Sequence, residues 1–149
     1  MNKQLNKKQG FTIIEVVLVL AIAGLIFLMV FIALPALQRN QRDTQRRSDG
    51  GTIVSQLVSY TTNNDGAIPT TAAQITAFQT GYLSNLKDPS SGTQYTISAG
   101  TTNPSTTGTI VYYATGKCDG ENLASGGTSK QAAIAIKLES NGWFCKSNL

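Results

Sequence analysis

The chain has 149 residues, a formal net charge of +4 and no histidine, and only 13% of its residues are charged. The missing histidine excludes a Ser-His-Asp or Cys-His catalytic arrangement, and the scattered acidic residues lack the spacing of a paired acid and base. We therefore expect no enzyme and no cofactor, and no structural zinc site, because two cysteines without histidine cannot supply four ligands.

The amino-terminal region combines a basic segment with a long apolar run. Residues 1–10 contain Lys3, Lys7 and Lys8, whereas residues 11–37 carry no charge except that of Glu15. As a helix rising about 1.5 Å per residue, the apolar run is about 40 Å long, enough to cross a hydrocarbon core of about 30 Å. The three lysines favour a cytoplasmic amino end. The pattern predicts a single-pass membrane protein.

Two ordinary interpretations fit this region less well. A secretory signal peptide has a shorter apolar run that ends at a small-residue cleavage site, whereas here the run is far longer and no Ala-x-Ala site closes it. A plain transmembrane anchor satisfies the length and the charges. It gives no reason, however, for a carboxylate at Glu15 near one end of the span, where a charged group is costly and usually has a function.

The order of residues around this carboxylate is distinctive: Lys7-Lys8-Gln9-Gly10-Phe11-Thr12-Ile13-Ile14-Glu15. This run resembles the processing site of type IV prepilins and the related pseudopilins. The resemblance implies that a prepilin peptidase removes residues 1–10 by cutting between Gly10 and Phe11, and that Phe11 is then N-methylated. It further implies that residues 11–37 lie first in the inner membrane and then in the core of a helical filament of identical subunits.

Three residues of the apolar helix have roles that follow from the same resemblance. Glu15 is expected to neutralise the amino terminus of a neighbouring subunit and so to set the axial register of the filament. The alternative is a solvated carboxylate at the rim of the membrane. Gly24 and Pro35 weaken the helix and are expected to mark a kink or a segment that melts during assembly. Pro35 lies a few residues after the usual proline position of the family, which Ile32 occupies here, and a static kink is the alternative.

Residues 38–62 are predicted to continue the helix as a solvated stem. Arg39 with Asp43, and Asp43 with Arg47, are spaced four apart and predict ion pairs within the helix. The interspersed aspartates and the lack of aromatic residues argue against nucleic acid as a partner. Gly50 and Gly51 weaken the helix without ending it. Beyond them one apolar stripe is expected to need a cover, and it consists of Ile53, Val54, Leu57, Val58 and Thr61.

Residues 63–149 are predicted to form a small head. A short helix is expected over Thr71–Gln79 with its inward side chains at Ala72, Ile75 and Phe78. Strands are expected at Tyr95–Ile97, Thr109–Ala114 and Ala132–Leu138. In the last strand one face should cover the apolar stripe, and it consists of Ile134, Ile136 and Leu138. The fold class is therefore α+β: a long helix whose distal half packs on a small antiparallel sheet, in the pilin lollipop arrangement.

Cys118 and Cys145 are the two cysteines of the chain and both belong to the predicted extracytoplasmic head. Disulfides persist in such compartments, and a small head benefits from a covalent link worth about 2–4 kcal/mol. The pair resembles the disulfide-bounded loop of many pilins, whereas two free thiols are the alternative. Asp119 and Glu121 flank Gly120, but they supply too few ligands to predict a calcium site.

The sequence thus favours a structural subunit of a type IV pilus that serves adhesion, twitching motility or DNA uptake. The alternative is a pseudopilin or minor pilin of a type II secretion or competence system. Either interpretation implies a membrane-inserted precursor that becomes part of an extracellular filament. Its expected partners are further copies of the chain, the prepilin peptidase and the pilus assembly machinery, with no direct contact to nucleic acid.

Overall fold

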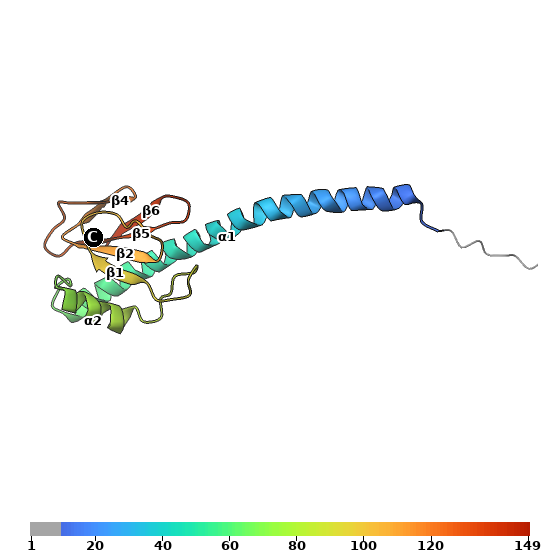
Figure 1. Cartoon of the computed structure of the whole chain (residues 1–149). Helices are drawn as coiled ribbons and strands as arrows, with labels where there is room; N and C mark the ends of the chain where they lie inside the picture. The colour runs from blue at the N-terminus through green and yellow to red at the C-terminus, as the bar shows by residue number, and fades with distance from the viewer. Residues whose placement is uncertain (1–9) are drawn as a thin grey trace, which may run out of the picture. The chain divides into compact units, whose positions relative to one another are not determined.

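The computed structural model describes residues 10–149 and has an α+β architecture (Figure 1). Two helices come first, α1 at Ile13–Asn63 and α2 at Ala72–Tyr82. Six strands follow them: β1 at Thr96–Ala99, β2 at Thr109–Ala114, β3 at Lys117–Asp119, β4 at Asn122–Ala124, β5 at Ala132–Lys137 and β6 at Trp143–Ser147. The chain divides into two compact units, residues 1–38 and residues 39–149. The predicted leader, with Lys3, Lys7 and Lys8, lies outside the described residues apart from Gly10.

The first unit contains the apolar part of α1, as the sequence predicts. Helix α1 is long and apolar enough to cross a membrane by length and composition. Gly24 and Pro35 both lie inside it, so neither residue ends the helix.

The second unit contains a four-stranded sheet in the order β1-β2-β5-β6. The β2–β5 and β5–β6 pairs are antiparallel, as expected, but β1 pairs with β2 in parallel, from Thr96 opposite Thr109 to Ala99 opposite Tyr112. The sheet is therefore mixed rather than purely antiparallel. Parallel pairing requires the chain to return to the end where the first strand began. Here the loop 100–108, rich in Gly, Ser and Thr, makes that return.

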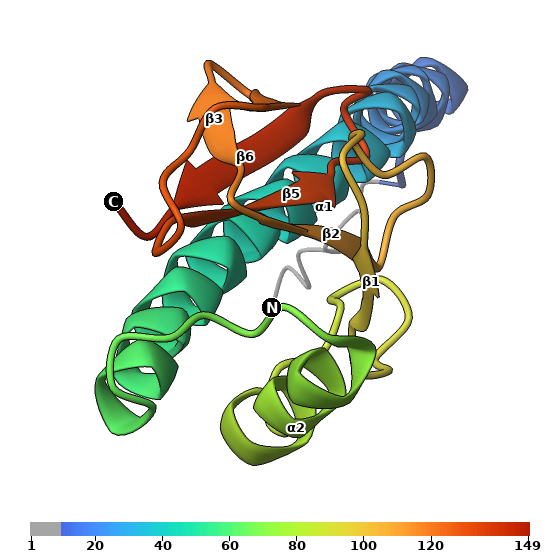
Figure 2. The same cartoon turned by 90° about the vertical axis from the view of Figure 1, so that its left-hand side faces the viewer.

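The second half of α1 runs along one face of this sheet (Figure 2). Ile53, Val54 and Leu57 of the predicted stripe are buried, but Val58 is 45% exposed and Tyr60 is buried instead. Residues 53, 57 and 60 follow the 3.6-residue period of one helix face, whereas residue 58 is rotated about 100° away from residue 57. The assignment of Val58 to the core was therefore wrong.

Strand β5 supplies the opposite side of this core. Ile134 and Ile136 belong to the same buried cluster as Ile53 and Leu57, which confirms the predicted contact. Ala133 and Ala135 alternate with them and are also fully buried, because strands β3 and β4 pack near β5. A strand buried on both faces in this way reads as a continuous apolar run.

Helix α2 starts in a capping box. The Thr71 side chain accepts a hydrogen bond from the Gln74 amide, and the Gln74 side chain accepts one from the Thr71 amide. The helix extends to Tyr82, three residues beyond the predicted end at Gln79. Ile75 and Phe78 are buried as predicted, but Ala72 is exposed, because the first turn of α2 projects from the core.

Gly50 marks the closest approach of α1 to the sheet. A Cβ atom on Gly50 would lie 2.5 Å from Cε1 of Phe144 and 3.1 Å from Cδ1 of Ile136. On Gly51 the nearest atom would be Nζ of Lys146 at 3.7 Å, an ordinary contact. The helix runs through both glycines, as expected, but only Gly50 is required by packing.

We expect opposite results from alanine at these two adjacent positions. Gly51→Ala should raise the free energy of unfolding by up to about 1 kcal/mol, because alanine is the better helix former. Gly50→Ala has the same propensity gain but overpacks the interface with β6 at a cost of about 1–3 kcal/mol, so it should destabilise. Denaturant unfolding of the full chain in detergent measures both. Equal stabilisation by the two variants would contradict the assigned close approach.

Candidate functional site

The Gly10–Phe11 peptide bond lies just before the first turn of α1. Gly10, Phe11 and Thr12 have no regular secondary structure, and the Phe11 side chain is 89% exposed. Helix α1 begins at Ile13. An exposed bond that precedes a helix is accessible to a peptidase, because no helical hydrogen bond has to break before the backbone can enter an active site.

Glu15 and Thr12 form a capping box at the start of α1. The Thr12 hydroxyl accepts a hydrogen bond from the Glu15 amide at 3.3 Å. In return, Oε2 of Glu15 accepts hydrogen bonds from the Thr12 amide at 3.0 Å and the Thr12 hydroxyl at 2.8 Å. Such reciprocal bonds satisfy amides that the first helical turn leaves free. The Thr-x-x-Glu spacing is the sequence signal of this motif, and our sequence interpretation missed it.

The apolar side chains that follow Glu15 have no cover within residues 10–149. Every large apolar side chain from Phe11 to Leu37 is between 48% and 89% exposed. In the second unit, by contrast, the exposed large apolar residues are Val58 and Leu149. Continuous exposed apolar surface of this extent is characteristic of membrane contact or of association with other chains. The helix therefore requires lipid or protein around it.

Gly24 and Pro35 lie inside this exposed helix, which continues through both. A Cβ atom on Gly24 would meet nothing within 4 Å, so packing within the described chain does not require glycine there. Pro35 has no amide hydrogen and leaves the Phe31 carbonyl without its usual helical donor. The two positions thus remain candidates for bending or melting, as the sequence predicts.

The stem charges form a buried cluster on Arg46, whose side chain is 0% exposed. Nε of Arg46 donates to Asp88 at 2.7 Å, and Nη1 donates to Glu139 at 2.9 Å and to Asp43 at 3.1 Å. Nη2 donates to the Ser90 hydroxyl at 2.9 Å. A single guanidinium therefore joins α1 to the loop before β1 and to the turn between β5 and β6.

Asp43 and Arg42 complete this cluster from the same helix. Asp43 accepts the amides of Glu139 at 2.8 Å and Ser140 at 3.0 Å, so it holds the β5–β6 turn by its backbone. Arg42 donates to both carboxylate oxygens of Glu139, at 2.8 and 2.6 Å. This two-bond geometry is the specific form of an arginine–carboxylate pair. The cluster fixes the turn 138–142 against α1.

The predicted ion pairs of Arg39 with Asp43 and of Asp43 with Arg47 are wrong. Asp43 instead pairs with Arg46, and Arg47 pairs with Glu121 at 3.1 Å. The expectation of a solvated stem holds for one face of the helix only, because Asp43, Arg46 and Asp49 are buried. The head packs on this part of α1, and tertiary partners offer stronger hydrogen bonds than neighbours on an exposed helix face.

The carboxylates of the head respond to this environment. Burial raises the pKa of Asp88, but the hydrogen bonds from Arg46 and Ser90 and the Arg46 charge outweigh it, and the pKa lies below its ordinary value. The Arg42 hydrogen bond, against a smaller effect of burial, likewise lowers the pKa of Glu139. Both groups are therefore held in their charged form.

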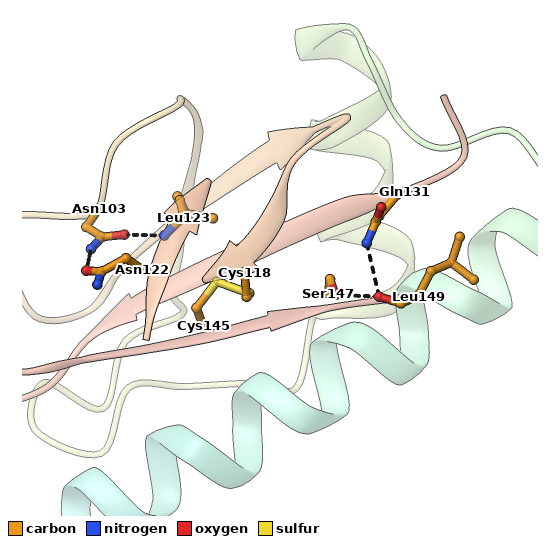
Figure 3. Close-up of a disulfide and its surroundings, with 8 residues drawn as sticks. All are labelled: Asn103, Cys118, Asn122, Leu123, Gln131, Cys145, Ser147 and Leu149. Atoms are coloured by element: carbon orange, nitrogen blue, oxygen red, sulfur yellow. Dashed lines mark hydrogen bonds between the residues drawn. A yellow bond between two sulfur atoms is a disulfide. The ribbon is translucent and has the colours of Figure 1, made fainter. Parts of the chain in front are cut away.

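Cys118 and Cys145 form a disulfide that joins β3 to β6, with their Cα atoms 5.8 Å apart (Figure 3). Next to it, Asn103 accepts the Leu123 amide at 2.9 Å and donates to Asn122 at 2.7 Å, which ties the loop 100–108 to β4. The linkage fastens the two-stranded β3–β4 sheet to the edge of the four-stranded sheet.

The acidic residues near the disulfide do not form a metal site in the structure. Within residues 10–149 no group of three or more His, Cys, Asp or Glu side chains is placed to hold a metal ion. Asp119 is exposed at the end of β3, and Glu121 points to Arg47. The described chain thus presents an exposed Gly10–Phe11 bond before a capped helix, an exposed apolar helix and a charge cluster that anchors the head.

Comparisons with known proteins bear on the amino-terminal part. Comparison with curated proteins and with solved structures gives no match. A family model, the prokaryotic N-terminal methylation motif, matches residues 5–31. This range contains the Gly10–Phe11 bond, the capping box of Glu15 and most of the apolar run 11–37. Residues 5–31 therefore carry the class III signal of type IV pilins, and the chain has the features of a membrane-anchored precursor of the pilin or pseudopilin kind.

Proposed function

We propose that the chain is the structural subunit of a type IV pilus. Prepilin peptidase would cut between Gly10 and Phe11 and Phe11 would be N-methylated. The processed chain would then leave the inner membrane and polymerise into an extracellular filament. The observation that supports this proposal is the methylation motif over residues 5–31, which continues into an apolar helix that is exposed in the described part of the chain. Adhesion, twitching motility or DNA uptake are the activities such a filament would serve.

The exposed apolar helix gives the proposal its physical basis. While the precursor is in the membrane, lipid covers the side chains between Phe11 and Leu37. After extraction, the same side chains must be covered by equivalent helices of other copies, because water would be unfavourable at about 25 cal/mol for each Å² exposed. A head-to-tail contact between identical subunits that does not close on itself produces a helical fibre. Lipid and the helices of other subunits are thus alternative environments for the same apolar side chains.

Expression with a prepilin peptidase and a pilus assembly system provides the test. We expect sheared extracellular fibres to contain this chain with an amino terminus at Phe11, carrying the added mass of one methyl group. Gly10→Asp should abolish processing, and the chain should remain in the membrane with residues 1–10 attached. Fibres built from uncleaved chain would refute the processing step. Processed chain found only as a trace component of fibres made from another subunit would favour the minor pilin or pseudopilin alternative.

A further inference from the structure

Asn141 occupies the turn between β5 and β6 and is the asparagine of this sequence that precedes a glycine. Its side chain is exposed, and its φ of 66° lies in the left-handed region, which asparagine tolerates better than most residues. The Leu138 amide donates to the Gly142 carbonyl at 3.1 Å and closes the turn.

Lys137 contacts the peptide group that links these two residues. Its Nζ donates a hydrogen bond to the Asn141 carbonyl oxygen at 3.3 Å. The same ammonium lies 4.3 Å from the centroid of the Trp143 ring, a cation–π contact that limits where the side chain can go. A positive charge is therefore held at the oxygen of the Asn141–Gly142 peptide bond.

We propose that Asn141 is a site of self-catalysed deamidation and that Lys137 accelerates it. Hydroxide or water first removes the proton from the Gly142 nitrogen. This nitrogen then attacks the side-chain Cγ of Asn141, the N–Cγ bond forms, and the Cγ–Nδ2 bond breaks as ammonia leaves with an added proton. Water opens the resulting succinimide at either carbonyl carbon and gives aspartate or isoaspartate. No oxidant or reductant takes part.

The position of Lys137 matches the charge that develops in the first step. When the Gly142 nitrogen loses its proton, the negative charge is shared with the Asn141 carbonyl oxygen through the peptide resonance. That oxygen is the atom to which the Lys137 ammonium donates. A positive donor at the place where negative charge forms lowers the barrier, as in an oxyanion hole. Glycine at position 142 leaves the nitrogen open to the side chain that it attacks.

The modification would change the charge cluster through the turn. Residues from Gly50 onward carry five lysines and five acidic residues, so one new carboxylate makes the head negative. Isoaspartate also lengthens the main chain by one methylene group next to Ser140, whose amide Asp43 accepts at 3.0 Å. The hydrogen bonds that hold the turn to α1 would then no longer fit, and older subunits would have a more weakly anchored head.

Peptide mapping by mass spectrometry tests this on the purified full chain in detergent, incubated at mildly alkaline pH. We expect aspartate and isoaspartate to accumulate at position 141 well before any other asparagine changes. Isoaspartate is diagnostic, because direct hydrolysis of the side-chain amide cannot produce it. Lys137→Met should slow the conversion of the folded chain about threefold, the size expected of one solvent-exposed charged contact. Lys146→Met, on the neighbouring strand, should leave the rate unchanged.

Denaturant separates assistance by Lys137 from a change in turn stability. In the unfolded chain Lys137 no longer sits at the Asn141 carbonyl, so Lys137→Met and the unsubstituted chain should convert at equal rates. A variant that merely loosened the turn would convert faster when folded, not slower. The proposal is overturned if folded chain keeps Asn141 intact while denatured chain converts, or if Lys137→Met has no effect on the folded rate.

Discussion

Replacing Arg46 with methionine is expected to lower the free energy of unfolding of the head by about 3–5 kcal/mol, because it leaves buried carboxylates without their counter-ion. Arg46 is 0% exposed, and its guanidinium contacts Asp43, Asp88 and Glu139 at 2.7–3.1 Å. Methionine fills much of the same volume, so lost packing contributes little. Denaturant unfolding of the full chain, followed by the fluorescence of Trp143, measures the change.

Arg47→Met is the matched control at the adjacent position. Arg47 pairs with Glu121 across a surface where the two side chains are 45% and 55% exposed. Such exposed pairs contribute between zero and about 1 kcal/mol, because water competes for both charges. The two variants make the same chemical change on the same helix. Equal losses of stability at positions 46 and 47 would show that the buried cluster does not anchor the head.

Acidity provides a second readout of the same cluster. The pKa values of Asp88 and Glu139 are lower in the folded chain than their ordinary values. Groups of this kind stabilise the fold at pH values above their unfolded pKa, and the contribution is lost as the pH falls through the folded pKa. The free energy of unfolding of the head should therefore fall as the pH is lowered. In Arg46→Met the buried carboxylates lack their partner, so protonation should relieve part of the defect and reduce the acid sensitivity.

Local patterns in the sequence predicted both helices and strands β1, β2 and β5, but not strands β3, β4 and β6. The apolar run predicts the first part of α1, and alternation predicts β2 and β5 nearly to their observed bounds. Ile134 and Ile136 also face Ile53 and Leu57 as expected. In each case a period of 3.6 or 2 residues carries the information, and neighbours in the chain suffice to reveal it. The capping box of Thr12 and Glu15 was equally readable, since its signal spans four residues.

The charge cluster could not be derived in the same way. Arg46 lies 42 residues from Asp88 and 93 residues from Glu139 in the sequence. No local spacing distinguishes these partners from Arg39 or Arg47, which share the helix and the charge. Their selection depends on which face of α1 the head covers, and that face is settled by packing at Gly50 and Leu57. The parallel pairing of β1 likewise depends on the path of the loop 100–108, not on strand composition.

The two environments of Glu15 connect the structure to the proposed function. In the described chain its carboxylate is satisfied by Thr12 of the same helix. In a filament the proposed partner is the amino group of Phe11 on a neighbouring subunit, which exists only after the Gly10–Phe11 bond is cut. Under this proposal the capping box gives the carboxylate a partner before processing, and the new cation would compete for it afterwards. Ion pairing is stronger than capping inside an apolar filament core, because the local dielectric constant is low.

Glutamine at position 15 is expected to prevent filament formation almost completely. Glu15→Gln keeps an acceptor for the Thr12 amide, and glutamine is a normal third residue of a capping box. It removes the negative charge, so each amino terminus would enter the filament core unpaired, and at least a tenfold lower yield of sheared fibres should result. Mass analysis of membrane-bound chain should still show an amino terminus at Phe11, which separates failed assembly from failed processing.

Thr12→Val is the complementary variant to Glu15→Gln, because it removes the capping hydroxyl and retains the charge of Glu15. Loss of such a cap weakens the first turn of a helix by about 1 kcal/mol. The surrounding helices of a filament would hold that turn in place, so the fibre yield should stay close to that of the unsubstituted chain. If Thr12→Val lost its fibres while Glu15→Gln assembled normally, helix capping rather than charge pairing would be the function of Glu15. Only an ion pair between subunits predicts that Thr12→Val forms fibres and Glu15→Gln does not.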